Sequence, residues 1–170
     1  MGGSGSGRSG WRPVVEYGLK LDSYRLQRQG LLNIHEWGVS SGSLVWSITS
    51  TGEKVASTGY SINYGNRSMT LDYTKTIDGE KYPVNDIVWL LIQKTNFGGS
   101  RFLFLCPKCA ARVAKLYLPN GALYFRCRRC YNLTYQSSNS SHAFDSLFWN
   151  LASETGVPFK AVKEVLKNKW

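Results

Sequence analysis

The chain has 170 residues, 42% of them hydrophobic and 14% aromatic, and a formal net charge of +10, which suits one domain or two small ones with a buried core. It contains no run of 18 apolar residues and its first residues hold no apolar signal segment, so we expect no membrane span, no secretory signal and a cytoplasmic location.

Residues 1–12 are predicted to form a flexible arm. The first ten are Gly, Ser, Met1 and Arg8, so they offer no side chains for a core. Such a segment is typical of an expression linker, and equally of a native basic tail carrying Arg8 and Arg12. Composition leaves both interpretations open.

Residues 13–100 are predicted to form an antiparallel β domain preceded by a short helix. The helix is expected over residues 19–32, because Asp22 can cap its start, Leu26 would face inward and Gly30 suits the position after its end.

Strand patterns follow that helix and are separated by turn signals, of which Asp78-Gly79 is the strongest hairpin signal. The stretch 87–93 is almost continuously apolar, so we expect a buried strand there. The turns recur every 8–14 residues along the sequence, which favours an antiparallel sandwich or a small barrel. The expected strands cover residues 44–48, 55–64, 69–73, 87–93 and 102–105.

Two Cys-x-x-Cys pairs lie in residues 101–135, Cys106 with Cys109 and Cys127 with Cys130, and seventeen residues separate the pairs. Each pair directs two sulfurs at one ion, and two pairs complete a tetrahedron. The segment between them has a hairpin pattern around Pro119-Asn120-Gly121. We therefore predict a zinc ribbon with one structural Zn²⁺, and no catalytic role for it because four thiolates leave no position for water.

Other uses of these cysteines fit less well. Disulfides need an oxidising compartment, and thioredoxin-type redox chemistry needs a single Cys-x-x-Cys at a strand-to-helix turn. Iron is a second metal for the same ligands.

The predicted ribbon is strongly basic, with no Asp or Glu between residues 101 and 135. Zinc and four thiolates carry a net −2, so the effective charge of the ribbon is about +5. One-sign charge interleaved with aromatic rings is typical of a nucleic-acid-binding surface, the alternative being a solvated basic face. The candidate phosphate contacts are Arg101, Lys108, Arg112, Lys115, Arg126, Arg128 and Arg129. The candidate stacking rings are Tyr117 and Tyr124, while we expect Phe125 and at least one tyrosine to cover the core of the ribbon.

Residues 136–170 are predicted to form a helical hairpin that resembles a helix-turn-helix. Residues 136–141 form a polar joint, Ser141 can cap the first helix, Gly156 ends it, and Pro158 suits the first turn of the second. In a true helix-turn-helix the exposed stripe of the second helix enters the major groove. A hairpin that only packs, or a ubiquitin-associated-like motif, fits the same pattern. The stripe consists of Lys160, Lys163, Glu164 and Lys167, and its three lysines are the candidate nucleic-acid contacts.

No catalytic constellation is apparent, so we expect a protein that is not an enzyme and takes no small-molecule substrate. His35 and His142 are isolated, and no Ser-His-Asp spacing or phosphate-cradling loop is present. Four acidic residues lie around turns and are interpreted as solubilising charge, with a metal-dependent nuclease as the enzymatic alternative. These are Asp72, Asp78, Glu80 and Asp86.

Several segments together resemble uncharacterised bacterial proteins of prophages and integrative elements. The resemblance covers nearly the whole chain up to Tyr135. It implies a native glycine arm, a zinc ribbon and a mobile-element setting, and no activity, since that family has none assigned. The segments are 1–8, 55–60, 97–102, 105–109, 112–117 and 125–135.

The sequence thus predicts a mostly β fold, an antiparallel sandwich or small barrel, with an integrated four-cysteine zinc ribbon and a C-terminal helical hairpin. The expected function is non-enzymatic nucleic-acid binding, with DNA favoured over RNA, for a phage or other mobile element. The alternative is a phage- or plasmid-encoded inhibitor of a host defence complex, of the anti-CRISPR or anti-restriction type, that acts by protein–protein binding.

Overall fold

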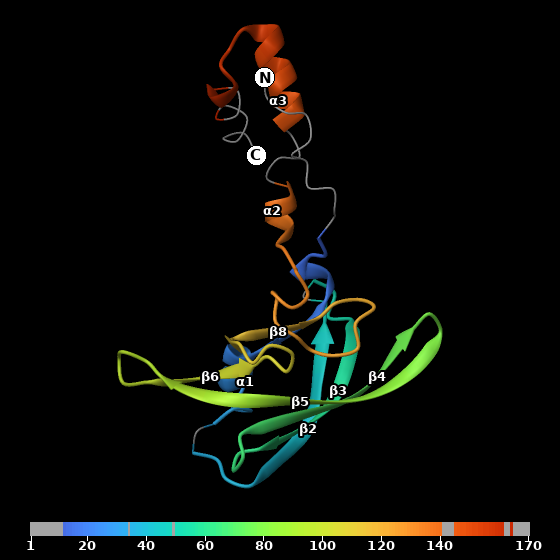
Figure 1. The fold of residues 1–170 in the computed structure, drawn as a ribbon, viewed down its shortest axis with the longest axis vertical. Coiled ribbons are helices and arrows are strands. Elements are labelled where there is room, and N and C mark those ends of the chain that lie inside the picture. Colours follow the sequence, from blue (N-terminus) through green and yellow to red (C-terminus); the bar gives the residue numbers. More distant parts are fainter. Residues whose placement is uncertain (1–11, 34, 49, 141–144, 162–163, 165–170) are drawn as a thin grey trace. The chain divides into compact units, whose positions relative to one another are not determined.

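The computed structural model describes residues 12–33, 35–48, 50–140, 145–161 and 164 (Figure 1). The chain divides into two compact units, Met1–Leu133 and Thr134–Trp170. The predicted fold class is confirmed, since the chain is mostly β and brings its four cysteines together. Within the described residues, no helix combines the length and the hydropathy needed to cross a membrane.

The first unit is built on a curled antiparallel sheet, a half-barrel, so it follows the barrel alternative and not the sandwich. Its six strands lie side by side in chain order, each paired with the next. The short connections and alternating burial explain this meander. The strands are β2 (Val39–Ser47), β3 (Lys54–Asn63), β4 (Ser68–Ile77), β5 (Glu80–Lys94), β6 (Ser100–Leu105) and β7 (Arg112–Val113).

The hairpin between β4 and β5 begins at the predicted Asp78-Gly79 turn. Both residues have positive φ, 51° and 86°, which is the conformation that a two-residue turn needs to match the twist of its strands. Ile77 pairs with Glu80 across it. The turn therefore fixes the register along both strands.

Strand β5 differs from the prediction on one face. Val88 is 0% exposed and Leu90 5%, but Ile87 and Trp89 are each 48% exposed. Side chains alternate between faces along a strand, and only the inner face of the curled sheet carries the core. The prediction of a fully buried strand was wrong because an apolar run does not reveal whether both faces are covered.

The predicted N-terminal helix is shorter than expected. Residues 19–22 form β1 (Leu19–Asp22), which pairs with β8 (Lys115–Leu118), and α1 covers Ser23–Arg28 after a single 3-10 turn η1 at Val15–Tyr17. The caps are as predicted: the Asp22 side chain accepts hydrogen bonds from the amides of Tyr24 and Arg25, and Gly30 has φ +78°. Pairing with a distant strand overrode local helix preference over the first four residues.

Helix α1 also closes one edge of the sheet. The Gln27 side-chain amide donates to the carbonyl of Ser100 at 3.1 Å and accepts from the Phe102 amide at 3.4 Å. These are backbone groups of β6 that a further strand would otherwise bind. A side chain therefore takes the place of a strand where β7 does not reach.

The core joins the sheet, the helix and the ribbon in one cluster. Its largest fully buried side chains include two rings, Phe104 of β6 and Phe125 of the ribbon. Phe125 lies stacked near Trp46 and edge-on to Tyr73, with ring centroids 6.2 and 6.0 Å apart. The ribbon is thus part of the first unit and packs on the inner face of the sheet.

The second unit is helical. Residues 136–140, expected as a polar joint, form α2 (Gln136–Ser140), and α3 covers Asp145–Thr155. Gly156 follows with φ +69°, as predicted for the end of that helix, and residues 159–161 are again helical. The rings of Trp149 and Phe159 stack with centroids 4.5 Å apart. The predicted cap Ser141 and the histidine His142 lie outside the described residues.

Candidate metal centre

The four cysteines form a compact cluster of sulfur atoms. All four Sγ atoms lie within 4.8 Å of one another, and the Cys106–Cys130 and Cys109–Cys127 separations are 3.8 and 3.7 Å. A tetrahedron of thiolates with metal–sulfur bonds of about 2.3 Å has edges of about 3.8 Å. The cysteines are free, and their geometry fits one tetrahedral ion.

Local backbone turns direct the first pair of sulfurs. Cys106 follows β6 directly, and its carbonyl accepts from the amide of Ala110 at 2.8 Å. Ala110 has φ 53°, the left-handed conformation that reverses the chain after the knuckle. The amide of Cys106 then bonds the carbonyl of Ala111 at 2.9 Å. This closed turn leaves both sulfurs on the same side.

The second pair is brought to the first by a short bridge. Tyr117 and Arg126 exchange both backbone hydrogen bonds, at 2.8 and 3.0 Å, and Cys127 comes next in the chain. The predicted turn is present, since Gly121 has φ 78° and the Ala122 amide bonds the carbonyl of Pro119. After the turn, the segment of residues 122–126 pairs with β8 through this single bridge, while β8 pairs along its other edge with β1.

The cluster is electrostatically suited to a cation. Burial raises the pKa of the Cys106 thiol, but the amides of Cys127, Cys109 and Lys108 outweigh it and lower that pKa to about 7. Burial and the three neighbouring sulfurs raise the pKa of Cys130 to about 12. Four thiolates thus repel one another at this spacing, and a bound cation removes the repulsion.

The cysteine cluster extends from the buried core of the first unit to its surface. Cys106 and Cys127 are 1% and 2% exposed, whereas Cys109 is exposed. The Cys127 amide also donates to the sulfur of Cys106 at 3.3 Å, which stabilises a thiolate ligand. An ion held by these four sulfurs would have a full coordination shell and therefore a structural role.

Asp86 is a buried anion that the sequence did not reveal. It is 4% exposed on the inner face of β5, where its carboxylate accepts from the Phe125 amide at 2.7 Å and lies 3.5 Å from the Arg126 guanidinium. Burial raises the pKa of this carboxyl above its usual value, and the Phe125 amide and the Arg126 guanidinium offset that rise only in part. The prediction of solubilising charge was wrong at this position, and its place between Val84 and Val88 in the alternation of β5 was the available signal.

The structure separates the basic residues of the ribbon into two groups. In the first, Arg126 pairs with Asp86 and lies 5.0 Å from the centre of the Tyr124 ring. Lys115 lies 3.5 Å from Asp22, and Arg101 donates to Gln93 and to the hydroxyl of Tyr24. These three candidate phosphate contacts already have partners within the fold.

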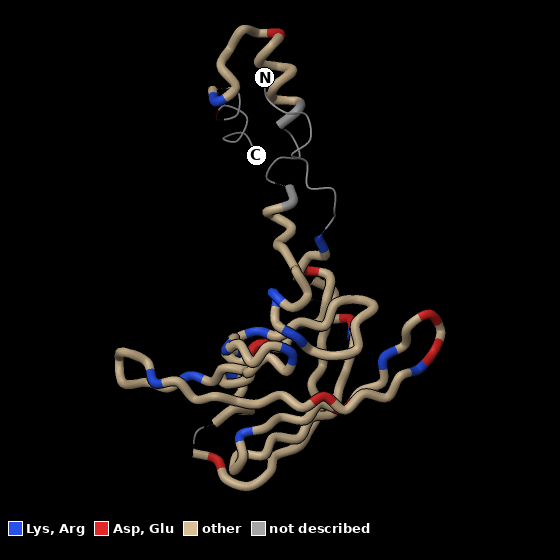
Figure 2. The backbone as a smooth tube through the Cα atoms, viewed as in Figure 1, with Lys and Arg blue, Asp and Glu red and all other residues tan. Residues whose placement is uncertain are grey.

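The second group is exposed and lies next to the four cysteines in the sequence. It consists of Lys108, Arg112, Arg128 and Arg129. Each is within three residues of a cysteine, so the four side chains start close to the cysteine cluster. Figure 2 shows Lys and Arg positions gathered around this part of the first unit.

The aromatic candidates divide in the same way. Phe125 is 1% exposed and Tyr117 5%, as expected for the core of the ribbon, so Tyr117 cannot stack on a base. Tyr124 is 42% exposed, but its ring already faces Arg126. In the second unit Lys160 is exposed, while Lys163 and Lys167 lie outside the described residues.

The acidic residues do not form a second site. Asp72, Asp78 and Glu80 are exposed, Asp72 accepts from Asn85, and Glu80 accepts from the hydroxyl of Tyr82 at 2.6 Å. Among the described residues, the cysteine cluster is the one group of His, Cys, Asp or Glu with metal-binding geometry. The geometry therefore gives the nuclease alternative no support.

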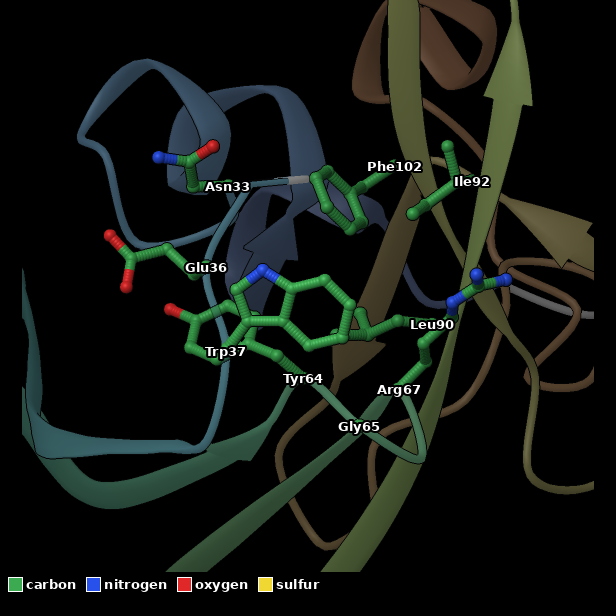
Figure 3. A pocket seen from close by; sticks show the side chains of 9 residues that line it. All are labelled: Asn33, Glu36, Trp37, Tyr64, Gly65, Arg67, Leu90, Ile92 and Phe102. Atoms are coloured by element: carbon green, nitrogen blue, oxygen red, sulfur yellow. The ribbon is translucent and has the colours of Figure 1, made fainter.

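A shallow hollow of about 130 Å³ opens beside β5 and β6 (Figure 3). Its floor is apolar, with Leu90, Ile92 and Phe102, and Trp37 lies across it between Glu36 and Arg67. Small-molecule sites are typically about 300–1,000 Å³, so this hollow is too small for a cofactor.

Comparison of the chain with protein-family models, curated proteins and solved structures finds no match.

Proposed function

We propose that this protein binds nucleic acid without catalysing a reaction, that it prefers DNA, and that one structural Zn²⁺ holds its ribbon. Four thiolates on two knuckles in a closed tetrahedron are the arrangement of structural zinc sites; iron fits the same tetrahedron, and metal analysis distinguishes the two. The resemblance of the sequence to prophage and integrative-element proteins supports a mobile-element setting.

One observation carries the proposal. Four exposed cations, Lys108, Arg112, Arg128 and Arg129, extend from a rigid centre in a segment that holds no acidic side chain. Fixed cations of one sign attract a polyanion and contact its phosphates at a smaller entropic cost than cations on a flexible tail. The exposed Lys160, which follows the Gly156 turn, supports DNA as the polyanion, since a basic second helix is typical of helix-turn-helix units.

The test measures binding of labelled dT20 and of a 20-base-pair duplex by fluorescence anisotropy at several salt concentrations. We expect affinity that falls steeply with salt. Replacing the four exposed cations by Ser should lower the slope of log K against log salt by about 3 to 4, if each contacts a phosphate.

A matched control variant carries Ser at four exposed basic positions elsewhere in the first unit, Arg28, Lys54, Lys81 and Lys94. It loses the same formal charge and should keep most of the affinity. Equal losses in the two variants would show that net charge alone attracts the probe. Metal analysis of the purified protein should give about one zinc per chain.

The proposal fails if neither probe binds at low salt. A host protein that then remains bound in stoichiometric amount after nuclease treatment would replace it with the inhibitor of a host defence complex.

A further inference from the structure

The outer face of the sheet carries an apolar patch where a polar surface would be expected. Ile87, Trp89 and Leu91 of β5 point away from the core, and Leu103 and Leu105 of β6 lie directly opposite Leu91 and Trp89. Ile87 and Trp89 are each 48% exposed. Leu103 is only 8% exposed and Leu91 and Leu105 are half-buried. We call Ile87, Trp89, Leu91 and Leu105 the outer-face patch, in which Ile87 and Trp89 are the exposed members. Exposed apolar patches on soluble proteins mark binding surfaces more often than chance.

The strand register connects this patch to the basic ribbon. Trp89 pairs with Leu105, and Leu105 pairs with Arg112 of β7, so the three side chains form one row on the outer face. Neighbouring strands are about 4.8 Å apart, which places the backbone of Arg112 about 10 Å from that of Trp89. Arg112 is exposed, and so is Lys108 of the first knuckle, which starts directly after Leu105.

We infer that Trp89 is a base-stacking platform for single-stranded nucleic acid and that Arg112 and Lys108 bind the phosphates beside it. This inference rests on the proposed function and names the form of nucleic acid that the site takes. An exposed ring next to fixed cations is the arrangement by which proteins bind single strands without reading sequence. In a duplex the faces of the bases are covered by their neighbours, so Trp89 has nothing to stack on.

The two ribbon tyrosines that the sequence indicated for stacking do not supply such a ring. Tyr117 is buried, and Arg126 lies over Tyr124. Trp89 is the exposed indole in the same cross-strand row as an exposed arginine. It therefore takes the role that the sequence assigned to the tyrosines.

Charge favours nucleic acid over a second copy of the chain. Two copies that docked patch to patch would bring two basic ribbons together, and residues 101–135 hold no acid to pair them. The acid on the outer face of β4, Asp72, is already hydrogen-bonded to Asn85. A polyanion, in contrast, is attracted by the same border of cations.

Three tryptophan variants of the full-length, zinc-loaded protein test the inference with dT20 and the duplex as probes. Trp89→Leu keeps an apolar side chain but removes the stacking face, and should weaken dT20 binding about tenfold or more while changing duplex binding less than twofold. Trp89→Phe should recover most of the affinity. Trp37→Leu is the matched control, since Trp37 is 87% exposed but borders the hollow on the inner side of β5 and β6.

A crosslinking measurement tests the same contact without substitution. After irradiation with a bromodeoxyuridine oligonucleotide, the adduct should lie in the tryptic peptide of residues 82–94, which contains Trp89. Adducts confined to other peptides would contradict the inference.

The outcomes separate the inference from the proposed function. If wild-type protein binds dT20 and Trp89→Leu binds equally well, or Trp89→Phe is as weak as Trp89→Leu, the platform is refuted and the basic ribbon stands. If only Trp37→Leu loses affinity for dT20, the base stacks in the hollow beside Trp37 and not on Trp89. A Trp89→Leu protein that forms fewer dimers, with unchanged dT20 affinity, would assign the patch to a second copy. If wild-type protein binds neither probe, the proposed function itself fails.

Discussion

The basic side chains of the ribbon fall into two groups that have the same charge and different surroundings. Arg126, Lys115 and Arg101 turn toward partners contributed by β5, β1 and α1. Lys108, Arg112, Arg128 and Arg129 are exposed beside the cysteine cluster, and Arg128 also has an interaction within the chain. The inward group joins the ribbon to the sheet, and the outward group is exposed to a partner. The net charge of residues 101–135 therefore overestimates the number of cations that are available to bind nucleic acid.

The largest expected effect comes from removing one cysteine of the cluster, because the positions of both groups of basic residues depend on the folded ribbon. Cys127→Ser deletes one of the two buried sulfurs of the cysteine cluster. For the proposed structural zinc, this removes a contribution of about 10–16 kcal/mol against a typical domain stability of about 5–15 kcal/mol, so the first unit should unfold. Thermal melting by near-ultraviolet circular dichroism, together with zinc analysis, checks this. A cooperative melt at the wild-type temperature would show that the ribbon folds without metal.

The next effect isolates the inward group. Asp86→Ala leaves the guanidinium of Arg126 and the amide of Phe125 without their buried acceptor, and should lower the free energy of unfolding by about 3–5 kcal/mol. Urea denaturation measures it. Glu53→Ala, at an exposed turn, is the control and should stay within about 0.5 kcal/mol of wild type. Similar losses in both variants would contradict the buried role of Asp86.

A paired substitution compares the two groups directly. Arg126→Gln should lower the free energy of unfolding by about 1–3 kcal/mol, because it leaves a buried carboxylate without its charged partner. Arg112→Gln should leave stability within about 0.5 kcal/mol and weaken binding of nucleic acid severalfold, with a salt slope lower by about 1. Urea denaturation and anisotropy on the same samples give both numbers. The distinction fails if Arg112→Gln destabilises the protein and Arg126→Gln does not.

The smallest expected effect concerns a neutral contact between ribbon and sheet. The Tyr73 hydroxyl donates to the carbonyl of Leu123 at 2.6 Å, so Tyr73→Phe should cost about 1 kcal/mol. Tyr82→Phe is matched to it, because that hydroxyl bonds Glu80 on the surface, and should cost close to nothing. A urea midpoint that is lower for Tyr82→Phe than for Tyr73→Phe would show that the hydrogen bond from Tyr73 to Leu123 does not stabilise the ribbon on the sheet.

Features governed by near neighbours could be predicted from the sequence. The two Cys-x-x-Cys turns, the Asp78-Gly79 hairpin and the Asp22 and Gly30 caps each depend on a few consecutive residues, whose conformational preferences survive in the fold. The gathering of four sulfurs also followed, because two knuckles joined by a hairpin leave few other arrangements.

Features set by distant residues could not be predicted. Residues 19–22 have a pattern compatible with a helix, and their pairing with residues 115–118 depends on contacts almost a hundred positions away. Asp86 is polar in the sequence, and its burial depends on Phe125 and Arg126 meeting it across the core. Predicting that Trp89 is exposed would have required knowing which face of β5 is covered. In each case tertiary contact decided between local alternatives.

The amide of Gln27, which bonds the backbone of Ser100 and Phe102, has a consequence for how copies of this protein behave in a crowded cell. An unprotected strand margin is a template on which sheets of separate molecules fuse into fibrils. Because the Gln27 side chain occupies these backbone groups, they are not available for pairing with a strand of another molecule.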